Sequence, residues 1–146
     1  MKKQFFTKEE NDRIVEAIQA AEKETSGEIR VFVESRCKYT EPLLRARQIF
    51  GKLKMGETTH HNGVLFYMAV DDRQLAIFGD HGIHEVVGEK YWKELVAHVL
   101  IYFNKENYAD GICQCVLKLG ESLRTYFPYD AQTAKNEIPD EIVFGK

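Results

Sequence analysis

Two strand-type runs in the middle of the chain place the strongest constraint on its fold. Residues 64–70 are almost entirely apolar and rich in β-branched and aromatic side chains, and residues 74–78 form a shorter run of the same kind. Between them lies Asp71-Asp72-Arg73, and aspartate is favoured in turns because its carboxylate bonds to nearby backbone amides. The pattern therefore predicts an antiparallel hairpin.

Histidines gather at the open end of this predicted hairpin. Pairing of the two strands brings the residues that precede the first strand close to those that follow the second. Four of the five histidines should then converge there, and Asp80 with them: His60, His61, His81 and His84. This convergence is the main functional lead in the sequence.

Helical patterns surround the hairpin. A capping box at residues 7–10 predicts the start of the first helix, and Pro42 suits the first turn of the second because its missing N–H costs little there. Apolar residues recur at helical spacing in two further segments, the last of which ends at Pro128. The predicted helices cover residues 8–24, a segment from Pro42 to a polar loop at 51–59, a segment from 85 or 88 to 103, and 108–127.

The order of these elements predicts the fold. Residues 29–33 form a first strand, so the chain contains a strand–helix–strand unit with parallel strands and a right-handed crossover. The predicted fold is α/β: a three-layer α/β/α sandwich on a small, mixed, mostly parallel sheet with one antiparallel hairpin. We expect a single domain over residues 1–146, with the tail at residues 129–146 docked on the body.

Composition and charge exclude several classes of protein. The net charge is -3, so the chain has no electrostatic footprint for nucleic acid. No apolar run approaches the roughly 20 residues that span a bilayer, and the lysines near the N-terminus precede no apolar segment of a secretory signal. We therefore expect a cytoplasmic protein with no membrane insertion. Its three cysteines cannot all pair, and we interpret them as reduced packing residues.

Five separate motifs give the chain a family resemblance that covers about residues 6–128. Two of them lie at the starts of the two parallel strands, and the third forms the hairpin turn. The fourth follows the hairpin, and the fifth lies at the start of the last helix. The motifs are Ser26-Gly27-Glu28-Ile29, Asn62-Gly63-Val64-Leu65, Asp71-Asp72-Arg73, Gly79-Asp80-His81-Gly82-Ile83 and Tyr108-Ala109-Asp110-Gly111. In these motifs the sequence resembles the TPM domain family, and most of all its short, free-standing bacterial cytoplasmic members.

This resemblance implies an α/β/α fold, in agreement with the reading of the elements above. It implies less about activity. One chloroplast relative is associated with photosystem II repair and is described as an acid phosphatase, whereas other relatives are membrane-anchored or secreted, and some bind calcium or other divalent cations. The chain shows no signal or anchor of that kind, so those biological roles do not carry over.

A divalent cation site is predicted at one end of the sheet. The parallel relation of the first two strands puts Glu28 at the same end as Asn62 and Asp80, and Asp110 in the first turn of the last helix is expected to reach it. Carboxylate and amide oxygens are ligands of calcium and magnesium, whereas His81 or His61 would favour a transition metal. We predict calcium or magnesium, with zinc as the less favoured ion. The structural alternatives are a turn role for Asp80 and a helix-dipole role for Asp110.

Two functions follow from this site. The first is a binding or scaffold domain that is cation-dependent and recognises an unknown protein partner. The alternative is a metal-assisted acid phosphatase at the same end of the sheet. That reaction needs a nucleophile or two metal ions together with cationic groups for the phosphate. The sequence contains no P-loop, dinucleotide-binding loop or nucleophile elbow, so an enzymatic role rests on family resemblance alone.

Overall fold

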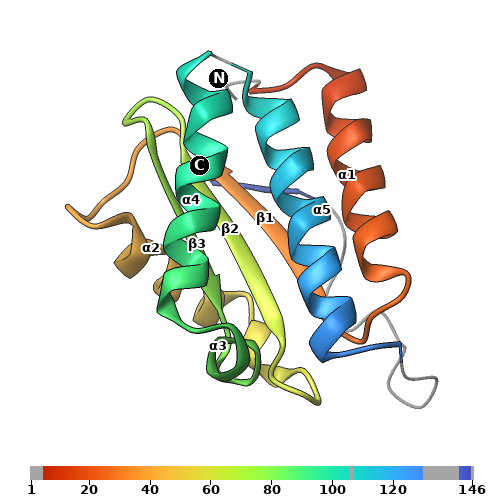
Figure 1. Cartoon of the computed structure of the whole chain (residues 1–146). Coiled ribbons are helices and arrows are strands. Elements are labelled where there is room, and N and C mark those ends of the chain that lie inside the picture. Colours follow the sequence, from red (N-terminus) through yellow and green to blue (C-terminus); the bar gives the residue numbers. More distant parts are fainter. Residues whose placement is uncertain (1–4, 106, 130–141, 146) are drawn as a thin grey trace.

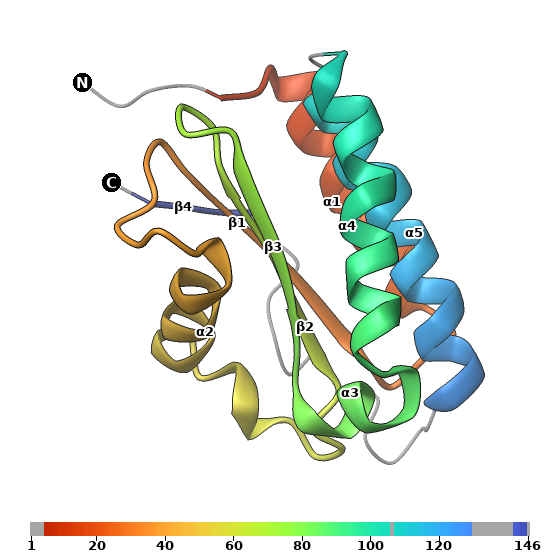
Figure 2. The ribbon, with the colours of Figure 1, turned by 60° about the vertical axis from the view of Figure 1, so that its left-hand side comes forward.

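A four-stranded mixed sheet lies between two layers of helices. The computed structural model describes residues 5–105, 107–129 and 142–145. The elements in chain order are α1 (Lys8–Glu22), β1 (Glu28–Glu34), α2 (Pro42–Lys52), the short 3-10 helix η1 (Met55–Glu57), β2 (Gly63–Ala69), β3 (Gln74–Gly79), α3 (His81–Val87), α4 (Glu89–Asn104), α5 (Tyr108–Tyr126) and β4 (Val143–Phe144). Figure 2 shows α1, α4 and α5 on one face of the sheet and α2 on the other. The predicted three-layer α/β/α sandwich is confirmed.

The sheet has the order β3-β2-β1-β4, with β2 and β3 antiparallel and the other neighbours parallel. Glu28 pairs with Gly63 at the start of β1, and Val64 pairs with Gly79 at the end of β3. The predicted hairpin and the parallel pair are therefore both present. One end of the sheet consequently carries the starts of β1 and β2 and the end of β3.

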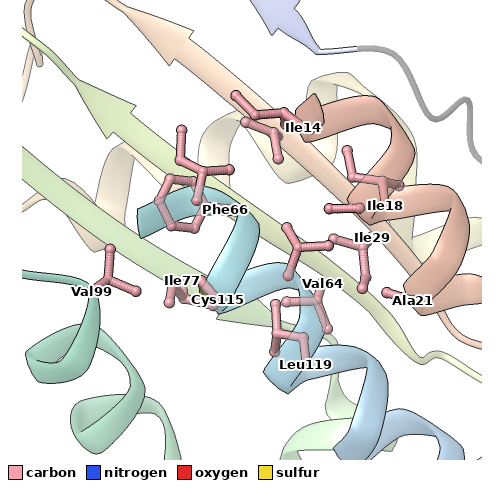
Figure 3. Packing of buried hydrophobic residues seen from close by; sticks show 14 of the residues in the cluster. Ile14, Ile18, Ala21, Ile29, Val64, Phe66, Ile77, Val99, Cys115 and Leu119 are labelled. Atoms are coloured by element: carbon pink, nitrogen blue, oxygen red, sulfur yellow. The ribbon is translucent and has the colours of Figure 1, made fainter. Parts of the chain in front are cut away.

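Alternation along the strands divides the apolar side chains between two cores. The larger core packs β1, β2 and β3 against α1, α4 and α5, and the smaller one packs the opposite face against α2. Figure 3 shows residues of the larger core, including Ile18 of α1, Phe66 of β2 and Leu119 of α5. Strands covered on both faces explain why residues 64–69 are apolar without interruption.

The first two helices begin as the sequence predicts. Thr7 accepts a hydrogen bond from the Glu10 amide at 3.1 Å, and the Glu10 carboxylate accepts one from the Thr7 amide at 2.9 Å. This reciprocal pair satisfies two amides that have no partner within the helix. Pro42 occupies the first turn of α2.

The third helix differs from the prediction. The sequence predicts one helix that begins at residue 85 or 88, but the chain forms two, α3 and α4, separated by Gly88 with φ +79°. Asp80 caps α3 by accepting a hydrogen bond from the His81 amide at 2.8 Å. His81 and His84 therefore lie on a short helix rather than in a loop, because the cap starts the helix directly after β3.

A buried ion pair lies on the α2 side of the sheet. Arg45 donates two hydrogen bonds to the Glu34 carboxylate, at 2.8 and 2.9 Å, and both side chains are less than 10% exposed. The Tyr67 hydroxyl donates a third hydrogen bond to Glu34. Burial raises the pKa of the Glu34 carboxyl, but the hydrogen bonds from Arg45 and Tyr67 outweigh it, so its pKa lies below the ordinary value of 4.5.

Part of the C-terminal tail pairs with the sheet. Val143 and Phe144 form β4 beside Phe32 and Val33 of β1, and the Gly145 amide donates to the Val33 carbonyl at 2.7 Å. The rest of the predicted docking concerns residues 130–141 and 146, which lie outside the described residues.

Candidate metal centre

The site is built where two segments meet at the end of β3. The Asp80 amide donates to the Gly63 carbonyl at 2.9 Å and so continues the hairpin pairing by one residue. Helix α3 then packs directly on the loop before β2. A Cβ on Gly82 would lie 2.3 Å from the carbonyl oxygen of His60 and 2.5 Å from that of His61. Only glycine permits this approach, and it brings α3 and the loop into contact.

Two imidazoles and one carboxylate converge at this contact. The Nδ1 atom of His61 lies 3.3 Å from Oδ2 of Asp80, and Nδ1 of His81 lies 3.3 Å from Oδ1 of the same carboxylate. The two imidazole rings stack with their centroids 4.3 Å apart. One ligand atom from each of the three residues lies within 4.8 Å of the other two, and this is the only such cluster among the residues that the structure describes.

The backbone and the surroundings hold these three side chains in place. His61 adopts a left-handed conformation with φ +50°, and its amide donates to the Thr58 carbonyl at 3.3 Å. The Asp80 carboxylate is 12% exposed and is oriented by its cap on α3, whereas the imidazoles of His61 and His81 are 46% and 65% exposed. The cluster therefore has a fixed carboxylate and two imidazoles that are open to solvent.

The spacing of these atoms fits a transition-metal site. Zinc binds imidazole nitrogen and carboxylate oxygen at about 2.0–2.2 Å, so the ligand atoms of a tetrahedral site lie roughly 3.3–3.5 Å apart. Each imidazole nitrogen lies 3.3 Å from one oxygen of Asp80, but His61 faces Oδ2 and His81 faces Oδ1. One ligand atom from each residue lies within 4.8 Å of the other two, so side-chain rotations would bring the three atoms to this spacing around one ion. Three protein ligands also leave a fourth position for water or a further ligand.

The other two histidines of the predicted convergence lie outside the cluster. Nδ1 of His84 accepts a hydrogen bond from the Trp92 indole at 2.9 Å, which fixes the ring against α4. The His60 ring lies 6.4 Å from that of Phe127. All four histidines are thus found at the predicted end of the hairpin, but only His61 and His81 face the same carboxylate.

Two predicted ligands, Glu28 and Asn62, lie at the expected end of the sheet outside this cluster. Glu28 is buried at the start of β1. Asn62 is 1% exposed and donates to the Ser26 hydroxyl at 3.2 Å, while its Oδ1 atom has no hydrogen-bond partner among the described residues. Their roles as ligands stay predictions.

Asp110 was predicted to reach the same end of the sheet, and this placement is wrong. Its carboxylate pairs with Arg13 at 2.9 Å and accepts a hydrogen bond from Asn107 at 2.9 Å. Helix α4 carries the chain away from Asp80, so α5 begins at the far end of the sheet (Figure 1). There Tyr108 lines a small cavity together with Val70 and Arg73 of the hairpin turn.

A groove opens beside the cluster. It has a volume of about 790 Å³ and follows β3 between α2 and α4. Asp80 and His81 line one end of it. The sequence did not predict this groove, because its walls come from two helices with 36 residues between them.

The layered architecture and the cluster define the class of the protein: a small α/β/α domain with a candidate transition-metal site at one end of its sheet. The family model of the TPM domain matches residues 1–122, so the chain belongs to the TPM domain family. The family resemblance inferred from the five sequence motifs is thus confirmed. A comparison with curated proteins finds no match.

Solved structures support the same assignment. The NMR structure of the BA42 protein from the psychrophilic bacterium Bizionia argentinensis is 38% identical, covers 99% of both chains and superposes with a TM-score of 0.90. Two N-terminal domains show a similar fold at low identity. The N-terminal domain of cg2496 from Corynebacterium glutamicum is 15% identical, and the match covers 82% of this chain and 74% of that one with a TM-score of 0.60. The N-terminal domain of a protein from P. gingivalis is 16% identical, and the match covers 84% of this chain and 78% of that one with a TM-score of 0.67. Among the described residues, no helix is both long and apolar enough to span a membrane.

Proposed function

We propose that this TPM domain is a metal-binding module that holds one divalent transition-metal ion through His61, Asp80 and His81. The observation that carries the proposal is the convergence of three ligand atoms within 4.8 Å, from two segments held together by the close approach at Gly82. Two imidazoles and one carboxylate suit zinc, whereas calcium and magnesium prefer six or more oxygen ligands. The donor set therefore favours zinc over the calcium or magnesium expected from the sequence.

Metal binding would act on this domain by joining the loop before β2 to helix α3. An ion that binds only the folded state raises the free energy of unfolding by RT ln(1 + [L]/Kd), about 2.7 kcal/mol at a hundredfold excess over Kd. A bound ion would also offer its fourth position to a ligand in the adjacent groove. A scaffold role that depends on the metal is consistent with both effects.

The test is isothermal titration of chelator-treated protein with zinc, calcium and magnesium, together with thermal unfolding. We expect one zinc ion per chain and much weaker binding of calcium and magnesium. His81→Ala should abolish zinc binding. Asp80→Asn should weaken it strongly while keeping an acceptor for the α3 cap. His98→Ala is the matched control, because His98 lies on α4 against Tyr102 and outside the cluster.

Three results would contradict the proposal. Zinc binding that is unchanged in His81→Ala would place the ion elsewhere. An equal loss in His98→Ala would indicate nonspecific binding to exposed histidines. A preference for calcium over zinc in the wild-type protein would instead support an all-oxygen site of the type predicted from Glu28, Asn62 and Asp80.

A metal-assisted phosphomonoesterase is the second candidate function for the same site. It is favoured by the groove beside Asp80 and His81, which Lys93 also lines, so a lysine and two of the three proposed metal ligands border one space. Lys93 contacts Glu89 at 3.6 Å and would have to exchange this partner for a phosphate. Zinc-dependent hydrolysis of an aryl phosphate, lost in His81→Ala and retained in His98→Ala, is the expected result for an enzyme. Hydrolysis that survives His81→Ala would refute this alternative.

A further inference from the structure

Strand β3 forms one edge of the sheet and presents backbone groups that β2 does not use. The bond from the Asp80 amide to the Gly63 carbonyl makes these two residues a hydrogen-bonded pair. Such pairs alternate along an antiparallel ladder, so Phe78 and Ala76 also face β2. The N–H and C=O groups of Leu75, Ile77 and Gly79 therefore point away from β2, toward the open edge.

The groove beside the metal centre follows this edge. Five consecutive residues of β3, from Leu75 to Gly79, line it, although their side chains alternate between the two faces of the sheet. A space lined by five consecutive residues of a strand must run along its edge rather than over one face. Apolar side chains lie on both of its walls, Leu43 of α2 on one side and Trp92 and Val96 of α4 on the other, and Glu89 and Lys93 of α4 also line it.

An extended peptide fits these features. Unpaired strand edges bind another strand through main-chain hydrogen bonds, and pockets beside the edge select the side chains. Here the outward groups recur every second residue over five residues, a length of about 17 Å. Because apolar helices flank both sides, the side chains on both faces of an added strand would meet apolar walls.

Charges at the two ends of the groove indicate a direction for the peptide. Helix α2 crosses over between the parallel strands β1 and β2, so it runs in the same direction as β3. Its residues Arg47 and Phe50 contact Phe78, which places its N-cap residue Glu41 at the Leu75 end of the groove. That carboxylate repels a peptide carboxylate. Glu89 of α4 also lines the groove but pairs with Lys93 at 3.6 Å, and a cation held at the metal centre would attract a peptide carboxylate to the other end.

We propose that this groove binds an extended apolar peptide, which adds as a strand to β3 and directs its C-terminal carboxylate to the ion held by His61, Asp80 and His81. The contact with the ion rests on the proposed function, whereas the strand addition rests on β3 and the groove. The added strand runs parallel to β3. Its carboxylate takes the fourth ligand position of the metal.

The test is fluorescence anisotropy with a fluorescein-labelled hexapeptide, a lysine followed by five alternating valines and alanines, with a free carboxylate. We expect saturable binding in the presence of zinc, weakened about tenfold or more by amidation of the C-terminus, which corresponds to about 1.4 kcal/mol. Removal of zinc should weaken binding of the peptide with a free carboxylate by a similar factor and leave binding of the amidated peptide unchanged. A proline in the middle of the peptide should abolish binding, because it removes a main-chain donor.

Two adjacent leucines on α2 provide matched variants of the protein. Leu43 lines the groove and is 46% exposed, whereas Leu44 is 49% exposed and lies outside the groove lining. Leu43→Asp should weaken binding of the hexapeptide at least about tenfold. Leu44→Asp should leave the affinity for the hexapeptide unchanged. Both substitutions fall on exposed positions in the same helical turn, so the fold should tolerate them equally.

The possible failures separate the two proposals. Zinc binding without peptide binding would overturn the groove assignment and leave the metal centre intact. Peptide binding whose affinity changes neither with amidation nor with zinc would overturn the proposed contact between the peptide carboxylate and the metal. Equal effects of Leu43→Asp and Leu44→Asp would place the peptide elsewhere. Sedimentation that shows a dimer disrupted by Leu43→Asp would assign the edge to a second copy of the chain instead.

Discussion

Replacing Arg45 by methionine tests how the buried carboxylate of Glu34 is stabilised. The substitution removes two hydrogen bonds, at 2.8 and 2.9 Å, from a carboxylate that is 6% exposed. Among the residues that the structure describes, the Tyr67 hydroxyl is the side-chain donor that remains. Breaking a buried ion pair on one side typically costs 3–5 kcal/mol, because the remaining charge is uncompensated. We expect a loss of about this size in the free energy of unfolding at pH 7.

The pH dependence identifies the cause of this loss. In the wild-type protein the pKa of Glu34 lies below 4.5, so its contribution to stability is present above pH 4.5 and is lost as the pH falls below it. Without Arg45, burial should raise this pKa above 4.5, and the stability penalty should grow as the pH rises. Protonating a carboxyl with the ordinary pKa of 4.5 at pH 7 costs about 3.4 kcal/mol, because pH 7 lies about 2.5 units above that pKa and each unit costs about 1.36 kcal/mol. The penalty should therefore shrink as the pH falls from 7 to 5, by at most about 2.7 kcal/mol over these two units.

Urea unfolding monitored by circular dichroism at pH 7 and pH 5 measures both values. The matched control is Arg124→Met, which breaks an ion pair with Glu24 at 3.1 Å whose partners are 55% and 66% exposed. Exposed pairs contribute about 0.2–1 kcal/mol, so this variant should lose little stability at either pH. An Arg45→Met penalty that is the same at pH 5 and pH 7 would refute the explanation by a stranded carboxylate.

Two further predictions concern backbone contacts. Gly82→Ala should destabilise the protein by about 1–3 kcal/mol and weaken zinc binding, because its Cβ would overlap the His60 carbonyl at 2.3 Å. Gly51→Ala is its control and should be neutral or stabilising by up to ~1 kcal/mol, since a Cβ there meets nothing within 4 Å; equal melting temperatures for the two variants would contradict this reasoning. Thr7→Ala should lower the free energy of unfolding in urea by about 1 kcal/mol, because it removes the cap of α1. Thr7→Ser keeps a capping hydroxyl and should retain most of this stability.

The local elements were predictable because short-range chemistry determines them. The capping box at Thr7 depends on two side chains three residues apart, and the hairpin depends on aspartates between two apolar runs. The parallel pairing of β1 and β2 follows from the length of the intervening helix. From these elements alone, the sequence places Asp80 and the histidines at one end of the sheet.

The composition of the site was decided by tertiary structure. Helix α4 has 16 residues and carries the chain about 24 Å along the sheet, so Asp110 lies far from Asp80 and pairs with Arg13 instead. The cap formed by Asp80 turned an expected loop into α3 and selected His81, rather than His84, to face the carboxylate.

The groove depends on tertiary structure even more strongly. Leu43 and Trp92 belong to different helices on opposite faces of the sheet, and no local pattern relates them. What the sequence by itself determined was most of the helices and strands, α3 and β4 excepted, and which ends of the strands meet. Which side chains share a site was decided only by packing, because the direction and length of each helix fix where the next residue of the chain begins.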